Sequence, residues 1–360
     1  MIHYIFLIAF LFFAASSQAN ESAVVLQYHH VSDETPASTS ISPAMFEQHL
    51  EWLEENQFSV LPLPKLVNTL KNKQAFKHSK VVAITFDDAN RSVCDIAWPI
   101  LKKHQLAFTV FINTDPIARE FKSQCTWSQL QEMTASGLMT PANHSHRHLN
   151  MISAEFTANP VQWREMMREE IMGAQRIIDN KLRDARYLFA YPYGEYNTEL
   201  SELVSELGFI GFGQQSGAIG HHSDFSALPR FPASGQFANL ETLSTKLMSL
   251  AFPAKFVPGA DNPIQYTSEH NPPLLTVSSA DQSLLASTRC YNKKGQVLPI
   301  SRENNQLLVR AETTLEPGRH RYTCTSQSPI PERFYWFSHQ WLVEAGQERS
   351  FGEKFMDLFK

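Results

Sequence analysis

Apolar residues of this chain fall into two kinds of segment, which alternate from residue 22 to residue 213. Short continuous apolar runs are typical of buried strands, and apolar positions three and four residues apart are typical of amphipathic helices. Strands and helices in alternation build a parallel sheet wrapped by helices, so we predict an α/β fold, a distorted barrel of about 240 residues. Strands are expected at Ala23–Tyr28, Val81–Phe86, Ala107–Ile112, Arg186–Tyr191 and Phe209–Gly213, and helices from Ser42 and at Arg91–His104, Trp127–Ala135, Trp163–Leu182 and Thr198–Leu207.

The pattern changes near Pro258, where prolines cluster and short runs with alternating apolar and polar residues follow. Such alternation is typical of an antiparallel β-sandwich. We therefore predict a barrel domain at residues 20–257 and a small all-β sandwich, immunoglobulin-like or carbohydrate-binding-like, at residues 258–360.

The first residues have the pattern of a secretory signal. An uncharged apolar run from Tyr4 to Ala15 precedes the small-residue site Ser17-Gln18-Ala19, so residues 1–19 are predicted to be a signal peptide, although lysine and arginine are missing from its start. The run is too short to span a bilayer core, and no stable membrane insertion is expected. The sequence therefore predicts a periplasmic or extracellular protein.

Charge and cysteine content narrow the class further. A net charge of −5 and a pI near 6.3 provide no basic surface for phosphates, so nucleic acid is excluded as a partner. Four cysteines in an exported chain favour two disulfides, and their positions suggest Cys94 with Cys125 and Cys290 with Cys324 among three possible pairings. The composition does not indicate an oligomeric state.

Two aspartates, Asp87 and Asp88, directly follow the predicted strand Val81–Phe86. A buried carboxylate is costly unless it is paired or binds a metal, and ligands of parallel α/β sheets bind at the carboxyl ends of the strands. The pair therefore indicates a site at this edge. The alternative is that Asp88 only caps the helix that follows.

Three histidines, His144, His146 and His148, lie within five residues, about sixty residues after the paired aspartates. Two histidines four residues apart, joined by a carboxylate, supply three protein ligands and leave positions open on a zinc-like ion, as hydrolytic metal centres require. A histidine-rich surface loop is the alternative. Together with the paired aspartates, the cluster favours a metal site.

Three motifs resemble those of the polysaccharide deacetylase family, the carbohydrate esterases with a NodB-like domain. They are TFDD at Thr85–Asp88, HSHRH at His144–His148 and FAYPYG at Phe189–Gly194, and the resemblance covers roughly residues 22–235. It implies the distorted (β/α) barrel of that family, followed here by the β-sandwich.

The resemblance also implies a role for each matching residue. Asp87 would be the general base, and the backbone N–H of Tyr193 would help to hold the oxyanion. Substrate binding is expected at Tyr191, Pro192 and Arg230. The metal ligands would be Asp88, His144 and His148.

The family's general acid, in a late L-x-H motif, has no convincing match after Gly213, where His221-His222 lies in a polar loop. The opening strand instead ends in LQYHH. This arrangement resembles the circularly permuted deacetylases of biofilm poly-N-acetylglucosamine systems. We therefore favour His29 as the acid over His30, with a strand-end histidine that only packs as the alternative.

Two positions depart from the family pattern. Ala190 stands where many members have an arginine that tethers the base, and Arg230 is a candidate replacement unless it only pairs on the surface. His146, between the two ligand histidines, is expected to face solvent or to support a ligand.

The function implied is that of a metal-dependent hydrolase that removes N-acetyl groups from a β-linked N-acetylglucosamine polysaccharide. Zinc suits two histidines and one aspartate, although Co²⁺, Ni²⁺ or Fe²⁺ would fit nearly as well. One alternative is a catalytically weakened carbohydrate-binding or scaffold protein, motivated by Ala190 and the added sandwich. Another is a deacetylase of peptidoglycan, a lipid-linked sugar or a xylan ester.

Overall fold

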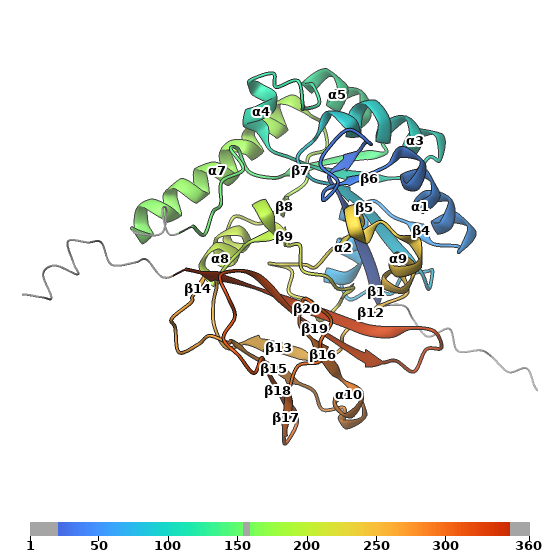
Figure 1. Ribbon diagram of the computed structural model, residues 1–360. Coiled ribbons are helices and arrows are strands. Elements are labelled where there is room, and N and C mark those ends of the chain that lie inside the picture. The colour runs from blue at the N-terminus through green and yellow to red at the C-terminus, as the bar shows by residue number, and fades with distance from the viewer. Residues whose placement is uncertain (1–20, 154–158, 346–360) are drawn as a thin grey trace, which may run out of the picture.

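The computed structural model describes residues 21–153 and 159–345. Its largest element is a nine-stranded sheet in the order β10-β1-β5-β6-β7-β8-β9, with β11 paired to β1 and β4 to β5 (Figure 1). Apart from β10, which runs antiparallel to β1, the paired strands of this sheet are parallel. The strands are β1 Ser22–Tyr28, β4 Ser59–Val60, β5 Val81–Phe86, β6 Phe108–Ile112, β7 Met139–Asn143, β8 Leu188–Ala190, β9 Ile210–Phe212, β10 Ile219–Gly220 and β11 Phe231–Pro232.

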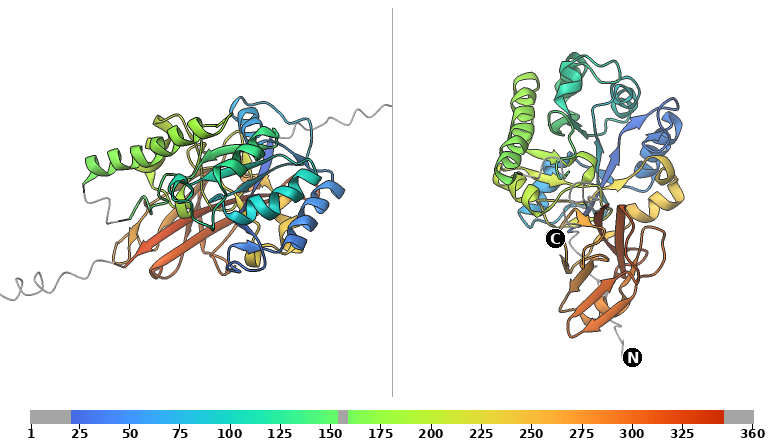
Figure 2. Two further views of the ribbon diagram at one scale, coloured as in Figure 1. Left: turned by 90° about the horizontal axis from the view of Figure 1, so that it is seen from above. Right: turned by 60° about the vertical axis from the view of Figure 1, so that its left-hand side comes forward.

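Helices wrap this sheet, which curls into a half-barrel and confirms the predicted α/β fold (Figure 2). The predicted helix at Trp127–Ala135 has those bounds, and the others lie within a few residues of their predicted ends. Only the helix expected from Arg91 differs in kind, because it opens with a π-helical segment at Val93–Ala97. The α-helices of this part are α1 Pro43–Glu55, α2 Leu63–Lys71, α3 Trp98–Lys103, α4 Thr114–Ala118, α5 Trp127–Ala135, α7 Pro160–Lys181, α8 Thr198–Glu206 and α9 Leu240–Leu247.

The strands are mostly apolar because both faces of the sheet are covered. In β1, Val24 and Leu26 join the apolar cluster that contains α1, whereas Ala23 and Val25 join the cluster that contains α2. A strand with one solvated face would alternate apolar and polar residues. The continuous apolar runs of the sequence therefore follow from this layered packing.

Two further sheets form the C-terminal part, which lies against the half-barrel (Figure 2). One has the order β12-β20-β19-β16 with β14 paired to β20, the other has the order β13-β15-β18-β17, and they share an apolar core around Trp341 and Leu275. The elements are β12 Leu250–Ala251, β13 Lys255–Pro258, β14 Ile264–Gln265, β15 Leu274–Ser278, α10 Gln282–Ser287, β16 Arg289–Tyr291, β17 Ile300–Glu303, β18 Gln306–Arg310, β19 Gly318–Gln327 and β20 Phe334–Glu344. One of these sheets includes β12, which lies before the predicted domain boundary at residue 258.

Disulfides join Cys94 to Cys125 and Cys290 to Cys324, and confirm the favoured pairing. The first joins the segment after β5 to the residues before α5, where Cys125 also donates its backbone N–H to the Ala89 carbonyl at 2.9 Å. The second links paired positions of β16 and β19. Each part of the protein therefore has its own cross-link.

Replacing Cys94 and Cys125 together by serine is expected to lower the free energy of unfolding by about 2–4 kcal/mol, because the cross-link restricts the unfolded chain. Denaturant unfolding of the variant and of the oxidised protein measures the difference, and the fully reduced wild type is the control for loss of both bonds. A double variant as stable as the oxidised protein would contradict this expectation.

Within residues 21–153 and 159–345, no helix is long and apolar enough to cross a membrane. The predicted signal peptide, residues 1–19, lies outside the described part of the chain.

A short two-stranded pair follows β1 directly. It joins β2 His30–Val31 to β3 Ser40–Ile41, and so it fixes the backbone next to His29.

Candidate metal centre

Three strands of the large sheet end at one place. β1 is followed by His29, β5 by Asp87 and Asp88, and β7 by His144. Because β1, β5, β6 and β7 are parallel neighbours, their carboxyl ends share one edge of the sheet. The sequence-predicted candidates therefore meet at the edge where α/β proteins bind ligands.

The backbone after β5 turns the two aspartates in different directions. The Asp87 N–H donates to the Tyr28 carbonyl at 3.0 Å and continues the pairing with β1. Asp88 and Ala89 then adopt positive φ angles of 72° and 53°, a region that side chains with a Cβ rarely occupy. As a result Asp87 is fully buried, whereas Asp88 remains partly exposed.

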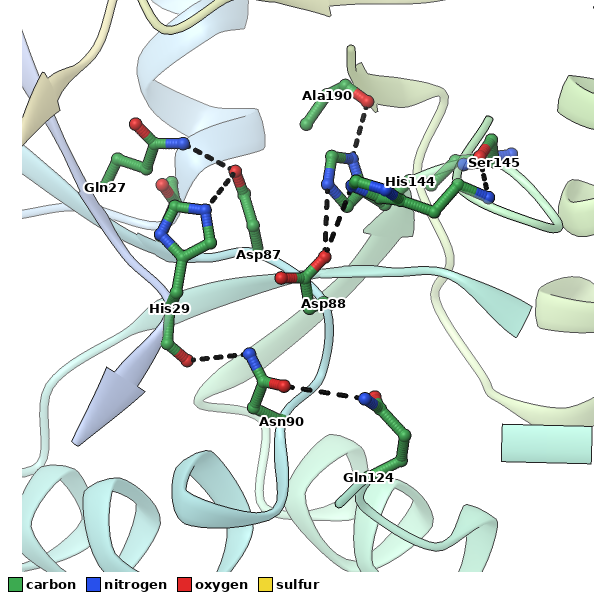
Figure 3. Close-up of polar contacts among 12 residues, drawn as sticks. Gln27, His29, Asp87, Asp88, Asn90, Gln124, His144, Ser145 and Ala190 are labelled. Atoms are coloured by element: carbon green, nitrogen blue, oxygen red, sulfur yellow. Dashed lines mark hydrogen bonds and ion pairs between the residues drawn. The ribbon is translucent and has the colours of Figure 1, made fainter. Parts of the chain in front are cut away.

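Asp88, His144 and His148 bring one ligand atom each within 4.8 Å of one another. Asp88 Oδ1 lies 3.5 Å from His144 Nε2 and 3.5 Å from His148 Nε2, and Figure 3 shows the His144 ring directed at this carboxylate. Ligands about 2.0–2.1 Å from a tetrahedral ion lie roughly 3.4 Å apart. The donor set and its spacing therefore fit a zinc-like divalent cation.

A hydrogen bond orients the His144 imidazole, and another positions the backbone of His148. The Nδ1–H of His144 donates to the Ala190 carbonyl at 2.7 Å, which leaves the Nε2 lone pair directed at Asp88. The backbone N–H of His148 donates to Ser145 Oγ at 3.0 Å. Burial and the neighbouring His144 lower the pKa of His148 to about 4, so this ring is neutral near pH 7, as a metal ligand must be.

Asp87 is held by a buried arginine. Arg230 donates from Nη1 to Asp87 Oδ1 at 2.6 Å and from Nη2 to Oδ2 at 2.8 Å, and both side chains have no exposed surface. Burial alone would raise the pKa of Asp87. The Arg230 guanidinium and two nearby imidazoles outweigh it and hold the pKa well below its usual range. Asp87 is therefore ionised beside the three-donor cluster.

Gln27 is a partner of Asp87 that the sequence analysis missed. Its side-chain amide donates to Asp87 Oδ2 at 2.6 Å (Figure 3). The only sequence signal for this role was that Gln27 is a polar residue in the apolar run AVVLQY. An ordinary strand end has the same pattern. With Arg230, Gln27 gives the carboxylate three hydrogen bonds, and this fixes its orientation.

His29 lies on the other side of Asp87, with Nε2 3.9 Å from Asp87 Oδ2. Its backbone carbonyl accepts a hydrogen bond from Asn90 Nδ2 at 3.2 Å, so the turn after β5 also positions this histidine (Figure 3). His30 is the less favoured candidate, and burial lowers its pKa, with the nearby His29 acting in the same direction.

Tyr193 has a positive φ of 60° in the 3₁₀ turn Pro192–Gly194, and its exposed ring packs edge-on against His148 with centroids 4.6 Å apart. Gly194 also has a positive φ, of 69°, and a Cβ there would lie 2.5 Å from the Gln214 Cβ. The backbone of this turn therefore lies beside the cluster in a conformation that its neighbours enforce.

The residues predicted to bind substrate are buried. Tyr191 is fully buried and donates its hydroxyl to the Ser226 carbonyl at 2.7 Å, Pro192 is buried, and Arg230 is occupied by Asp87. Their side chains offer no surface to a polymer, so we no longer expect them to contact substrate. The alternative considered for Arg230, as the tether of Asp87, matches its observed position.

His146 is directed away from the three-donor cluster. It is hydrogen-bonded through Nδ1 to Thr114 Oγ1 at 2.8 Å, and its Nε2 lies 3.9 Å from Asp115 Oδ1. The sequence-based expectation that it is not a ligand agrees with this position.

The fold and the cluster together define a class of protein: an α/β half-barrel that can hold a divalent cation at the carboxyl edge of its sheet, with a buried carboxylate and a histidine beside it. Residues 75–211 match the polysaccharide deacetylase family. The chain therefore contains a polysaccharide deacetylase domain, as its motifs predicted. This match supports an activity of the deacetylase class.

Known proteins resemble the chain over most of its length. The poly-beta-1,6-N-acetyl-D-glucosamine N-deacetylase of Staphylococcus aureus (strain MRSA252) is 25% identical over 227 residues, which cover 58% of this chain and 78% of that protein. Streptococcus pyogenes deacetylase PplD matches with a TM-score of 0.57 and 22% identity over 64% of this chain and 99% of that one. IcaB from Ammonifex degensii matches with a TM-score of 0.55 and 24% identity over 64% and 98%. These structures confirm the fold.

Proposed function

We propose that this protein is a metal-dependent N-deacetylase of a β-linked N-acetylglucosamine polysaccharide. The observation that carries the proposal is the convergence of Asp88, His144 and His148 within 4.8 Å, beside the ionised Asp87. The polysaccharide deacetylase match at residues 75–211 and the similarity to a poly-beta-1,6-N-acetyl-D-glucosamine N-deacetylase support the substrate class.

Amide hydrolysis needs an activated water, a stabilised oxyanion and a protonated amine. A divalent cation at the three-donor cluster would supply Lewis acidity, which polarises the acetamide carbonyl and acidifies water. Asp87 accepts the proton of the attacking water while Arg230 and Gln27 keep its carboxylate in place. The water oxygen bonds to the carbonyl carbon.

Two further groups complete the reaction. The backbone N–H of Tyr193 donates to the oxyanion, and His29, close to Asp87, donates a proton to the nitrogen as the C–N bond breaks. Acetate and a free amine are the products.

Zinc is the proposed metal because two neutral imidazoles and one carboxylate suit it, with Co²⁺, Ni²⁺ and Fe²⁺ as the other ions that this donor set accepts. Export to the periplasm or the cell exterior is proposed on the signal-like residues 1–19 and the two disulfides, which form in oxidising compartments.

The test measures acetate released by the purified protein from poly-β-1,6-N-acetylglucosamine, peptidoglycan, acetylxylan and a lipid-linked N-acetyl sugar. We expect release from the first, loss of more than about 95% of it after chelation, and recovery on adding Zn²⁺, because the Lewis acid supplies several kcal/mol of transition-state stabilisation. Each substrate without protein is the control.

Two outcomes would overturn the proposal. Acetate released only from another member of the panel would reassign the substrate. Binding to the polymer, with no acetate from any glycan at any metal loading, would favour the scaffold alternative. The observed Arg230–Asp87 pair removes one motive for that alternative, because the base has a tether although residue 190 is alanine.

A further inference from the structure

The loop that contains Tyr193 is held from the C-terminal part of the protein. Asp261 accepts the Thr198 N–H with Oδ1 at 3.1 Å and Oδ2 at 3.0 Å, at the start of α8. Asn262 donates from Nδ2 to the Tyr196 carbonyl at 3.3 Å and to the Gln340 carbonyl of β20 at 3.1 Å. Figure 1 shows β19 and β20 passing close to α8. Residues 192–198 therefore depend on partners outside the half-barrel.

Another of these contacts is an ion pair from β19, between the half-exposed Arg319 and the buried Glu195. Arg319 Nε donates to Glu195 Oε1 at 2.6 Å, and Glu195 is 4% exposed. The other carboxylate oxygen, Oε2, is buried without a hydrogen-bond partner. A buried carboxylate with so few partners depends strongly on its cation. Arg319 therefore fixes the position of Glu195.

Arg319 also lies near the ring of Tyr193, which packs beside the three-donor cluster. Its guanidinium carbon lies 5.7 Å from the centroid of the Tyr193 ring, and that ring packs on His148. Arg319 thus contacts both residues that flank Gly194 in the chain. An arginine from β19 sits one aromatic ring away from a proposed metal ligand.

We propose that Arg319 is a positioning residue of the active site, which the C-terminal β-sandwich supplies in order to hold the Tyr193 N–H on the oxyanion. The inference rests on the proposed function. Because Tyr193 has a left-handed backbone conformation, its N–H direction depends on the anchoring of the next residues. The C-terminal β-sandwich then contributes a residue to the deacetylase site and is more than an adjoining domain.

The test compares Arg319→Ala with Arg333→Ala as the matched control. Arg333 also joins the C-terminal part to the half-barrel, through Nε to the Met248 carbonyl at 3.0 Å and Nη1 to the Ser79 carbonyl at 2.8 Å. Ser79 precedes β5, so these hydrogen bonds lie at the amino edge of the sheet, opposite the three-donor cluster. Both variants lose an arginine that joins the C-terminal part to the half-barrel, but only Arg319→Ala loses contacts with residues 192–198.

Arg319→Ala is expected to lower kcat by about 10- to 100-fold with KM within about twofold of wild type, because a misdirected oxyanion donor weakens transition-state binding. Arg319→Lys should recover part of kcat by restoring the charge. Arg333→Ala should keep kcat near wild type. Wild-type kcat in Arg319→Ala, or an equal loss in both alanine variants, would overturn the inference.

Hydrogen exchange provides a readout that is independent of activity. Backbone amides in peptides that cover residues 191–197 should exchange faster in Arg319→Ala than in wild type. In Arg333→Ala their exchange rates should equal those of wild type. Unchanged exchange in Arg319→Ala would overturn the inference whatever the enzyme does. If wild type releases no acetate, the proposed function fails, and faster exchange would still show that Arg319 holds the loop. If Arg319→Ala does not fold, Arg319→Lys is used for both measurements.

Discussion

His144→Ala is expected to reduce acetate release by at least about 10³-fold, the scale on which single essential groups of hydrolytic sites act. The variant loses one of the three donors and the hydrogen bond from Nδ1 to the Ala190 carbonyl. Zn²⁺ binding, measured by isothermal titration with apo protein, should weaken in parallel. The cause is the missing Nε2 ligand, because the other two donors cannot fill its position.

His146→Ala is the matched control for this experiment. It removes a histidine two residues along the same loop, but its partners are Thr114 and Asp115 and it takes no part in the three-donor cluster. Acetate release and Zn²⁺ affinity should stay within about threefold of wild type, in line with a partly exposed polar contact. Equal losses in the two variants would show that the loop conformation, and not ligation by His144, is being measured.

Arg230→Ala is expected to lower the free energy of unfolding by about 3–5 kcal/mol, because it leaves the buried Asp87 charge without its cation. Arg230 also donates to the Gly213 carbonyl at 3.0 Å and lies over the Phe111 ring at 5.1 Å, so its packing is lost as well. Denaturant unfolding at pH 7 measures the change. Arg91→Ala, which breaks the exposed Arg91–Asp95 pair, should cost no more than about 1 kcal/mol.

The deficit of Arg230→Ala should shrink as the pH falls. In wild type the lowered pKa of Asp87 contributes stability that is present above the unfolded pKa and is lost as the pH falls through the folded one. Without Arg230, burial dominates and raises that pKa, so protonation of the folded state then stabilises the variant. Asp87→Asn combined with Arg230→Gln should recover stability but not acetate release. A deficit that is constant from pH 8 to pH 4 would contradict this account.

Local patterns were sufficient for the long elements of the half-barrel, but not for short ones such as β4, β10 and β11. Apolar runs in the sequence predicted β1, β5 and β6 because a sheet covered on both faces favours apolar residues at most positions, and helical spacing predicted α5 with its observed bounds. The motifs at Asp87–Asp88 and His144–His148 are each contiguous. Their convergence was a hypothesis from the sequence, and the structure explains it because the parallel strands β5 and β7 end at one edge.

Contacts between distant segments carry no such signal. Arg230 meets Asp87 across 143 residues of sequence, and the sequence analysis could propose it but could not distinguish a buried tether from a surface pair. Tyr191 and Pro192 were expected to contact substrate because they lie in a motif, but their burial depends on packing against segments such as Ser226. Gln27 and Arg319 were not predicted at all, since neither belongs to a recognisable spacing.

The register of β1 has a consequence for the order in which this site is built. β1 leads directly into His29 and pairs with β5 through Leu26 and Ile84, but its parallel partner on the other side is β11, at Phe231, next to Arg230. The proposed acid His29, the proposed base Asp87 and its partner Arg230 thus come from separate segments of the half-barrel. Such non-local pairing slows folding. A nascent chain that stops before residue 230 would have all three proposed metal donors but no partner for Asp87, so the complete site should form as one of the last events of folding.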